Sequence, residues 1–435
     1  MTSNAPTEAF VWAWLPGALE PVVVGRLKEQ SDRRLLFHYG RSYLDRPDAI
    51  PLDDRELPLQ KGFLPLFNGL SIPGCLRDGS PDAWGRRVIL NRIVGASDDT
   101  MQLNEITYML ESGSDRVGAL DFQRSATEYV PRLAGPATLE DLLESADRIE
   151  QGKPLSPDLV QALQHGTSIG GARPKALIET NSEKYIAKFS SSTDIMNFVK
   201  AEFVAMRMAD RLGLDVAQVR LVKAAGRDVL LIRRFDRLHT SKGWQRRLML
   251  SALTLLQLDE MMARYASYET LCEIIRHRFG SPEATLRELF ARLIFNILCG
   301  NTDDHARNHA AFWNGTTLQL TPAYDLCPQP RAGNEATQAM LIQGENRFSR
   351  LDVCIGAAAQ FLLSREEAIA TIDRLISGIQ EHWQAVCDEA ELSEVDRRLL
   401  WRRQFLNPFA FTVSAEASKK GSFSDKLSEH WKRFL

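Results

Sequence analysis

An apolar helix pattern that runs directly into the most polar stretch of the chain constrains this sequence more than any other feature. Leucine, isoleucine and phenylalanine recur at i, i+3, i+4 and i+7 spacing over residues 286–298, after a typical helix start at Ser281-Pro282. The pattern ends at Cys299, and the next residues read GNTDDHARNHAAF. Gly300 can turn the chain there. We therefore expect a buried helix that holds a polar loop rigidly.

Two residues of that loop have a spacing that suits phosphoryl transfer. Asp303 and Asn308 form Asp-x-x-x-x-Asn, the spacing of a protein kinase catalytic loop. In such a loop the aspartate accepts or orients the proton of the attacking hydroxyl, and the asparagine oxygen binds magnesium. Asp325, in LQLTPAYDL, follows a strand-like segment where a kinase places a second magnesium-binding aspartate. Taken alone, each pattern also fits a helix cap or a strand-end turn.

Segments upstream of the loop follow the order of a kinase N-terminal lobe. TSIGGARPK (167–175) is a Gly-rich turn whose amides could cradle phosphate, and YIAKF puts Lys188 on a half-buried strand. Glu202, on the next helix, is a possible partner of Lys188. IRRFDR (232–237) follows an apolar strand, as a linker between lobes would. A hairpin turn, a surface lysine and a charged strand end are the plainer alternatives, but the joint order favours the kinase-like interpretation.

The element pattern predicts an α+β chain with a bilobal protein-kinase-like fold. We expect an N-terminal α/β domain, with an extra small subdomain over residues 1–130 and a kinase N-lobe over 131–245, and an all-α C-terminal domain over 246–435. A strand-like interruption lies at 316–326. We also expect a helix from about residue 192 to a C-cap near Gly213, and a hairpin turn at Ala225-Gly226. Thr138 is the expected N-cap of one helix, and Ser364 and Glu367 form the expected capping box of another.

Composition narrows the classes of protein that fit. A net charge of −3 argues against a general nucleic-acid binder. The six cysteines stand singly with no CxxC pair, which argues against a zinc ribbon and favours a reducing cytoplasm. The N-terminal stretch MTSNAPTEAFVWAW lacks a basic start followed by an apolar run, and no apolar run reaches about 18 residues. We expect no secretory signal and no membrane span.

At these motifs the chain resembles the HipA family, the serine/threonine kinase toxins of bacterial toxin–antitoxin pairs, over nearly its full length. The segments that carry the resemblance are LRDGSPDAWGRRVI (76–89), ESGSDRVGAL (111–120), SIGGARPK (168–175), YIAKF, RRFDR, NTDDHARNHA, TPAYDL and LIQGENRFSRLD (341–352).

The resemblance implies a role for each matching residue. Asp303 would be the catalytic base, Asn308 and Asp325 would hold Mg²⁺, and Lys188 would bind the phosphates of ATP. Ser168 would be an autophosphorylation site that switches the enzyme off. The remaining residues implied to bind ATP are those of the phosphate loop (Gly170, Gly171, Ala172, Arg173, Pro174 and Lys175), those of the hinge (Arg233, Arg234, Phe235 and Asp236, the last at the ribose), and His305, Ala306, Arg307 and Tyr324.

Three residues depart from the family pattern. Asp304 stands where the family often has glycine and adds a carboxylate beside the base; it could point away or aid magnesium. Arg233 replaces an acidic hinge residue found in some members, but adenine contacts there are largely made by the backbone. Pro174 removes one backbone donor from the phosphate loop.

The resemblance also implies a substrate and partners. An aminoacyl-tRNA synthetase, most readily the one for glutamate, would be phosphorylated, which would stall translation and arrest growth. A HipB-like helix-turn-helix antitoxin would neutralise the toxin and link it to operator DNA. Two alternatives stay open: a metal-dependent hydrolase using Asp303, Asp304, His305 and His309, and a non-catalytic corepressor that only binds nucleotide. The basic cluster Arg397, Arg398, Arg402 and Arg403 fits a solvated helix face better than a DNA contact.

Overall fold

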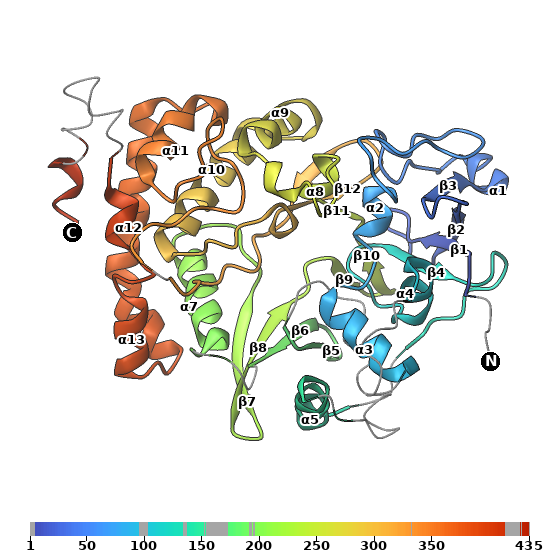
Figure 1. Cartoon of the computed structure of the whole chain (residues 1–435), viewed down its shortest axis with the longest axis horizontal. Helices are drawn as coiled ribbons and strands as arrows, with labels where there is room; N and C mark the ends of the chain where they lie inside the picture. Colours follow the sequence, from blue (N-terminus) through green and yellow to red (C-terminus); the bar gives the residue numbers. More distant parts are fainter. Residues whose placement is uncertain are drawn as a thin grey trace. The chain divides into compact units, whose positions relative to one another are not determined.

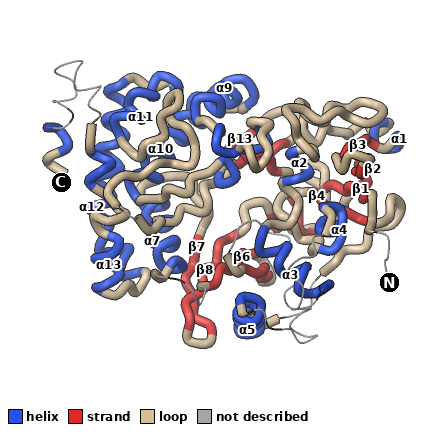
Figure 2. Tube along the Cα trace, in the orientation of Figure 1, coloured by secondary structure: helices blue, strands red, loops and turns tan. Residues whose placement is uncertain are grey.

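The computed structural model describes residues 5–94, 103–133, 137–151, 153, 173–190, 194, 196–331, 333–413, 427 and 429–434 (Figure 1). The chain forms two compact units. Unit 1 contains residues 1–194, 222–259 and 311–317, and unit 2 contains residues 195–221, 260–310 and 318–435. The predicted three-part division at residues 130 and 245 stays a prediction. Figure 2 separates the helices from the strands.

The first sheet of unit 1 is built from the N-terminal strands. Its order is β3-β2-β1-β4, with antiparallel pairs, and its strands are β1 (Glu8–Ala13), β2 (Val22–Glu29), β3 (Leu35–Tyr39) and β4 (Leu120–Gln123). Four helices lie between β3 and β4 in the sequence: α1 (Arg41–Leu44), α2 (Gly74–Arg77), α3 (Ala83–Val94) and α4 (Glu105–Glu111). Strands β2 and β3 lie in the apolar segments PVVVGRLK and RLLFHYG.

The second sheet has the order β5-β6-β8-β7. Its strands are β5 (Lys175–Glu179), β6 (Lys184–Phe189), β7 (Val219–Ala224) and β8 (Arg227–Arg233). Ala225 and Gly226 join β7 to β8 with φ of 47° and 76°, which confirms the predicted turn. Apolar residues of α3 and of α5 (Leu139–Glu150) share one buried core with β5, β6 and β8, and this core places the strand lysine. Thr138 caps α5 as predicted.

The rest of unit 1 consists of short elements after the second sheet. They are the hairpin of β9 (Arg237–Thr240) and β10 (Gly243–Arg246), then β11 (Met249–Ser251), α8 (Ala252–Leu255) and the neighbouring strand β12 (Ala310–Trp313). The Trp313 amide donates to the Leu248 carbonyl oxygen over 2.9 Å. Only the interruption at 316–326 was expected after residue 246, so the prediction of an all-α region missed β11 and β12. Both strands are only three or four residues long, too short for a clear periodic pattern.

Unit 2 is mainly helical and includes one short strand. Its elements are α7 (Phe198–Arg211), α9 (Tyr268–Arg278), α10 (Pro282–Cys299), β13 (Leu318–Leu320), α11 (Leu351–Ala357), α12 (Arg365–Glu389), α13 (Glu394–Leu400) and the 3₁₀ turns η2 (Ala263–Tyr265), η3 (Ala306–Asn308), η4 (Ala358–Phe361) and η5 (Pro408–Phe411). The Ser364–Glu367 capping box at the start of α12 is confirmed. Helix α7 begins later than predicted, because the Asn197 side chain caps it by accepting from the Lys200 amide.

Helix α10 is the centre of unit 2. All its apolar residues from Leu286 to Cys299 are buried, and it packs against α9, α11, α12 and η4. The predicted buried helix before the polar loop is therefore confirmed. Among the residues that the structure describes, no helix combines the length and the apolar character needed to cross a membrane.

Candidate active site

The polar loop is rooted in the last turn of α10. Gly300 has a φ of +77°, and a Cβ added there would lie 2.9 Å from backbone atoms of Gln404, so both the conformation and the space require glycine. The buried Asn301 continues the anchor. Its amide N–H donates to the Asn296 carbonyl oxygen over 2.8 Å, and its side-chain Nδ2 donates to Asn296 Oδ1 over 2.9 Å. The loop therefore starts from a fixed point.

Asp303 and Asn308 lie together in this loop, as their spacing predicts. Asn308 Nδ2 donates to the Asp303 carbonyl oxygen over 3.0 Å, and the His305 amide donates to the same oxygen over 2.9 Å. The Asp303 carboxylate is exposed. Partial burial raises its pKa, Asp325 and Asp304 raise it further by charge repulsion, and His305 opposes them. A carboxylate in this setting binds a proton more readily than a free aspartate, which suits a general base.

Asp304 faces the opposite way from Asp303. Its side chain is 1% exposed. One carboxylate oxygen accepts from the Tyr268 hydroxyl, and the other lies 2.7 Å from His309 Nε2. Asp304 therefore holds the loop to Tyr268, at the start of α9, with both carboxylate oxygens engaged inside unit 2.

Asp325 lies in a left-handed conformation after a short strand. Its φ is +60°, which few residues other than glycine, asparagine and aspartate adopt. The residues before it fix that geometry, because the Ala323 amide donates to the Asp215 carbonyl oxygen over 2.8 Å and the Tyr324 hydroxyl donates to the Arg307 carbonyl oxygen over 2.6 Å. Tyr324 therefore ties Asp325 to the loop that carries Asp303.

The other predicted loop residues have structural surroundings of their own. Ala306 is buried in η3, and Arg307 forms an ion pair with Glu260. His305 Nδ1 is buried and has no hydrogen-bond partner among the described residues. An orphan ring nitrogen next to the candidate base is a polar atom that a bound ligand could satisfy.

In unit 1, Lys188 is the next-to-last residue of β6, where it is half-buried. It is paired with Lys175 on β5 and with Leu230 on β8, so neighbouring strands on both sides fix its backbone. The predicted position on a half-buried strand is confirmed. Its predicted partner Glu202 lies on α7 of the other unit, and that pairing stays a prediction.

The phosphate-loop residues that the structure describes make internal contacts. Arg173 forms an ion pair with Asp194 over 2.6 Å. Lys175 is 1% exposed, and its Nζ lies 3.0 Å from Asp82 Oδ2, at the start of α3. The buried ion pair joins β5 to α3, so Lys175 has a structural role that its place in the motif did not indicate. Ser168, Gly170, Gly171 and Ala172 lie outside the described residues.

Asp236, predicted to contact ribose, is part of a buried ion network instead. Its two oxygens accept from Arg234 Nε (3.0 Å) and Nη2 (2.8 Å), from Arg237 Nη1 (2.9 Å) and from the Gly118 amide (2.8 Å). Burial alone would raise the pKa of Asp236, but the two arginines lower it to about 2. Three of these donors bond one oxygen and one bonds the other, and Asp236 is only 4% exposed, so the carboxylate is engaged inside unit 1.

The same network explains why two of the recognised motifs occur together. Arg234 Nη2 donates to the Arg116 carbonyl oxygen over 2.6 Å, and Arg234 and Arg237 both form ion pairs with Asp115. ESGSDRVGAL and RRFDR are therefore two halves of one buried ion cluster. Spacing could not show this, because the halves lie more than 100 residues apart.

Two hinge residues remain exposed or half-buried. Arg233 is exposed and forms an ion pair with Glu183 over 3.2 Å. Phe235 is half-buried and packs edge-on against Phe312, with ring centroids 5.9 Å apart. Neither arrangement blocks contacts of the hinge backbone with a ligand.

The donor set of the loop fits a hard cation that is shared with phosphate. Asp325 supplies carboxylate oxygens and Asn308 an amide oxygen, which are ligands that Mg²⁺ prefers. Within the described ranges, no three His, Cys, Asp or Glu side chains are grouped to hold a metal ion by themselves. The sequence did not single out Tyr268 or Glu260 as loop anchors, since both lie about 40 residues upstream with no local motif.

Comparisons with known proteins agree with this geometry. A model described as the HipA-like C-terminal domain matches residues 167–383, and one described as the HipA N-terminal domain matches residues 18–123. The putative kinase Y4mE of Sinorhizobium fredii is 25% identical over 332 residues, or 70% of this chain and 74% of that protein. The serine/threonine-protein kinase toxin HipA of Shewanella oneidensis is 26% identical over 248 residues, or 51% of this chain and 56% of that protein.

A solved structure supports the fold. The Shewanella oneidensis MR-1 complex of HipA, HipB and operator DNA contains a chain that matches with a TM-score of 0.67 and 20% sequence identity. The match covers 96% of this chain and 99% of that chain. The predicted mixed α+β, kinase-like fold is therefore confirmed.

Proposed function

Because this chain belongs to the HipA family of serine/threonine kinases, we propose that it is an ATP- and Mg²⁺-dependent kinase toxin that phosphorylates a component of translation. The observation that carries the proposal is the polar loop. Asp303 is exposed, Asp325 is near enough to raise its pKa, and the Asn308 amide is fixed to the Asp303 backbone. Three oxygen-bearing side chains in one place are what phosphoryl transfer requires.

We assign a role to each of these residues. Asp303 would orient the substrate hydroxyl and accept its proton. Asn308 and Asp325 would hold Mg²⁺, with the Asn308 amide nitrogen donating to Asp303 so that its oxygen is oriented for the metal. Lys188 would contact nucleotide phosphates. When bound, Mg²⁺ supplies positive charge that neutralises the phosphate oxygens.

The remaining residues would shape the nucleotide site. Arg173, Pro174 and the loop before them would lie near the phosphates, the backbone of Arg233, Arg234 and Phe235 near adenine, and His305, Ala306, Arg307 and Tyr324 near the catalytic loop. Phosphorylation of Ser168 would add nearly two negative charges beside the phosphate site and so inhibit the enzyme. Asp236 and Lys175 are left out of the ligand contacts, because their polar groups are engaged inside unit 1.

The substrate and partners follow from the family. We propose an aminoacyl-tRNA synthetase, first that for glutamate, as the substrate, with growth arrest as the result in the cytoplasm, where translation takes place. A HipB-like antitoxin would neutralise the toxin and connect it to operator DNA. The chain matches one from a complex of HipA, HipB and operator DNA, which supports such a partner.

The structure disfavours the two alternative functions. A hydrolase built on Asp303, Asp304, His305 and His309 would need these side chains to converge, but Asp304 and His309 are bound to each other inside unit 2. A corepressor without catalysis would have no need for two carboxylates and an amide together at Asp303, Asn308 and Asp325.

Transfer of labelled γ-phosphate tests the proposal. We expect wild-type protein to label the glutamyl-tRNA synthetase, and Asp303→Asn and Asp325→Asn to abolish labelling. Asp45→Asn, at an exposed aspartate in unit 1, is the matched control and should leave labelling unchanged. Nucleotide binding with no transfer to any protein would refute the kinase proposal. Phosphoproteomics after brief expression, with Asp325→Asn as the reference, would identify the substrate if it is not this synthetase.

A further inference from the structure

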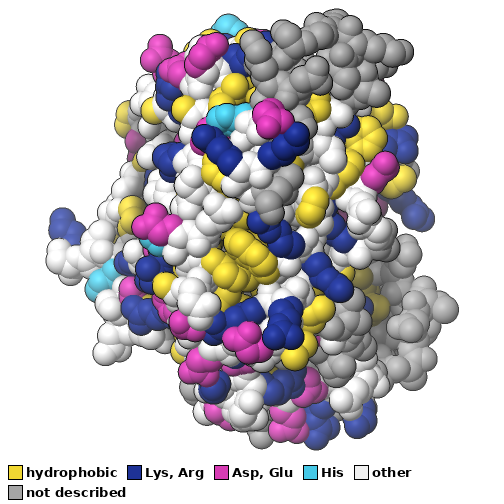
Figure 3. Space-filling model, turned by 90° about the vertical axis from the view of Figure 1, so that its left-hand side faces the viewer, with side chains coloured by type: hydrophobic (Ala, Val, Ile, Leu, Met, Phe, Trp, Pro, Cys, Tyr) yellow, Lys and Arg dark blue, Asp and Glu magenta, His cyan; other side chains and the backbone are white. Residues whose placement is uncertain are grey.

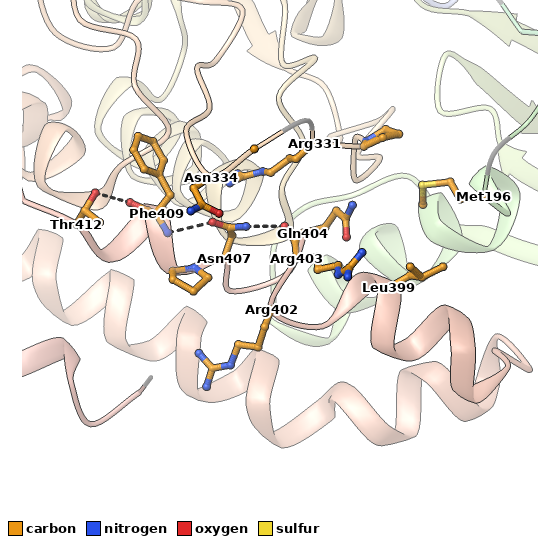
Figure 4. Close-up of a pocket in the computed structure, with 13 residues that line it drawn as sticks. Met196, Arg331, Asn334, Leu399, Arg402, Arg403, Gln404, Asn407, Phe409 and Thr412 are labelled. Carbon is orange, nitrogen blue, oxygen red and sulfur yellow. Dashed lines mark hydrogen bonds between the residues drawn. The ribbon is translucent and has the colours of Figure 1, made fainter.

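Unit 2 contains a second candidate ligand site, a cavity of about 760 Å³. One wall consists of Pro330, Arg331, Gly333 and Asn334, which follow the metal motif. The other consists of residues between Leu399 and Thr412, and Met196 completes the lining. Figure 4 shows Arg331 and Asn334 on the first wall and Arg403, Gln404 and Asn407 on the second.

Both walls are attached to the last turn of α10. The Gln329 amide donates to the Gly300 carbonyl oxygen over 3.0 Å, and the Leu406 amide donates to the Leu298 carbonyl oxygen over 2.7 Å. Gln404 backbone atoms lie against Gly300 so closely that no Cβ would fit. Backbone hydrogen bonds therefore fix the positions of both walls of the cavity.

Arg331 is the residue that most indicates a ligand in this cavity. All three of its guanidinium nitrogens are buried and have no hydrogen-bond partner within the described part of the chain. Burial lowers the pKa of Arg331, and only the neighbouring Cys299 thiol opposes this. Buried arginine without an acceptor is costly, because five N–H donors lose their water. The described lining includes no Asp or Glu side chain that could pair with it.

Other lining groups suit the same ligand. Gln404 is 8% exposed, and its Oε1 has no partner in the described residues. Arg403 is exposed at the rim, and Asn407 Nδ2 donates to the Arg403 carbonyl oxygen over 2.6 Å, which fixes the backbone between them. Phe409 and Leu399 add apolar surface. The site thus offers a buried cation, a second cation at the entrance and an apolar wall.

The basic cluster seen in the sequence divides into two groups. Arg397 pairs with Asp388 over 2.6 Å, and Arg402 donates to the Phe434 carbonyl oxygen over 2.8 Å, so both contribute to packing. In Figure 4 the Arg402 side chain points away from Gln404 and Asn407. Arg402 and Arg403 both line the cavity, but Arg402 is engaged by the Phe434 carbonyl oxygen, and Arg397 and Arg398 are not in the lining. Arg403 and Arg331 are therefore the charged contacts that we assign to a ligand.

We propose that this cavity binds a phosphomonoester, presented as a phosphorylated side chain of a peptide, with Arg331 and Arg403 as its charged contacts. A terminal phosphate has the charge and the acceptors that a buried guanidinium lacks, and arginine binds it through paired N–H donors. The apolar wall suits the organic part of the ligand.

A duplex nucleic acid fits less well. Nucleic-acid phosphates need a continuous basic surface, whereas Glu394 and Asp396 stand on α13 beside the cavity. Acidic and basic side chains alternate on the face drawn in Figure 3. A concave site with one buried arginine is better matched to a single phosphate group.

The attachment to α10 gives the site a route to the catalytic loop. The wall that carries Arg331 begins a few residues after Asp325, and both walls are bonded to the turn from which Asp303 emerges. A phosphate that fixes Arg331 would therefore also fix the segment that follows the metal-binding aspartate. The inference goes beyond the proposed function and does not need phosphoryl transfer.

Binding of N-acetyl-phosphoserine amide, followed by ³¹P line broadening and by calorimetry, tests the site. The measurements use the full chain carrying Asp303→Asn, so that binding is separated from catalysis. We expect saturable binding of the phosphorylated probe and none of the serine counterpart. Arg331→Gln and Arg403→Gln should each weaken binding at least tenfold, whereas Arg398→Gln, which removes an exposed arginine outside the cavity, should leave it unchanged.

Three results would overturn the proposal. Equal binding by wild type and by both cavity variants would place the phosphate elsewhere. No binding by a folded wild-type protein would show that the cavity takes no phosphomonoester. Binding of duplex DNA that Arg398→Gln and Arg403→Gln weaken equally, with no binding of the phosphoserine probe, would make this surface a nucleic-acid contact. Because Arg403 is exposed, its variant keeps the test valid if Arg331→Gln does not fold.

Discussion

The adjacent carboxylates Asp303 and Asp304 should respond to mutation in opposite ways. Asp303 is exposed, and among the described residues no hydrogen bond or ion pair anchors its side chain, so Asp303→Asn should abolish phosphoryl transfer without lowering stability. Asp304 is buried and bonded to Tyr268 and His309. Removing its carboxylate leaves two buried polar groups without their partner, at about 1–3 kcal/mol each, so Asp304→Ala should destabilise unit 2 by roughly 2–6 kcal/mol.

Tyr268→Phe provides the finer measurement. It removes one hydroxyl that donates to a buried carboxylate, a contact whose loss costs about 1.5–3 kcal/mol. For a domain of about 150–250 residues, each kcal/mol lowers the Tm by about 2–4 °C, so we expect a decrease of roughly 3–12 °C. Tyr265→Phe, at an exposed tyrosine on η2, is the matched control and should not change the Tm.

Differential scanning fluorimetry and labelled γ-phosphate transfer, run on the same samples, check both expectations. Below its unfolding transition, Tyr268→Phe should retain transfer, because the base itself is intact. If Asp304→Ala kept the wild-type Tm but lost transfer, Asp304 would belong to the chemistry, and the separation of roles between the two carboxylates would be wrong.

Three further perturbations test the electrostatics. His305 lowers the pKa of Asp303, so His305→Gln should move the acid limb of the kcat/KM profile to higher pH, measured by steady-state phosphate transfer from pH 4 upward. Burial, followed by the charge of Asp53, raises the pKa of Glu56 from 4.5 to about 7. The protonated Glu56 therefore stabilises the fold by about 3 kcal/mol below pH 4.5, and this stabilisation is lost as the pH rises through 7. Glu56→Gln should flatten this pH dependence of the free energy of unfolding, measured with urea. Lys175→Ala removes the cation from the buried ion pair with Asp82, so we expect thermal unfolding to show a loss of about 3–5 kcal/mol in the free energy of unfolding. A lysine that served nucleotide binding alone would change nucleotide affinity and not stability.

Local signals allowed much of the fold to be predicted from the sequence. The start of α10 at Ser281-Pro282, its end at Gly300, the capping box of α12 and the turn at Ala225-Gly226 each depend on a few neighbouring residues, and each is confirmed. Helix α7 begins late because one asparagine side chain caps it inside a run that reads as continuous helix. Very short strands such as β11 contain too few residues to show the alternating pattern that identifies a strand.

The site was harder to predict, because side-chain direction depends on distant contacts. The spacing of Asp303 and Asn308 correctly predicted that they lie together, because they are only five residues apart in one loop. Spacing could not show that Asp304 points inward, because its direction depends on the contact with Tyr268. Nor could it show that Asp236 is engaged in a buried ion network, because that depends on Gly118 and two arginines. Motif matching therefore identified the loop and the hinge, but it did not separate ligand contacts from buried supports.

The same arrangement occurs at both aspartates of the proposed site. Asp303 is followed by Asp304, which is bonded into unit 2, and Asp325 is preceded by Tyr324, whose hydroxyl holds the Arg307 carbonyl. Since consecutive residues of an irregular segment can face opposite directions, an inward neighbour fixes the backbone while the reactive carboxylate stays accessible. Asp325 needs such support most, because its φ of +60° is costly unless surrounding contacts maintain it. In this chain an inward aspartate gives the polar loop its support, which is a physical reason for a carboxylate at residue 304.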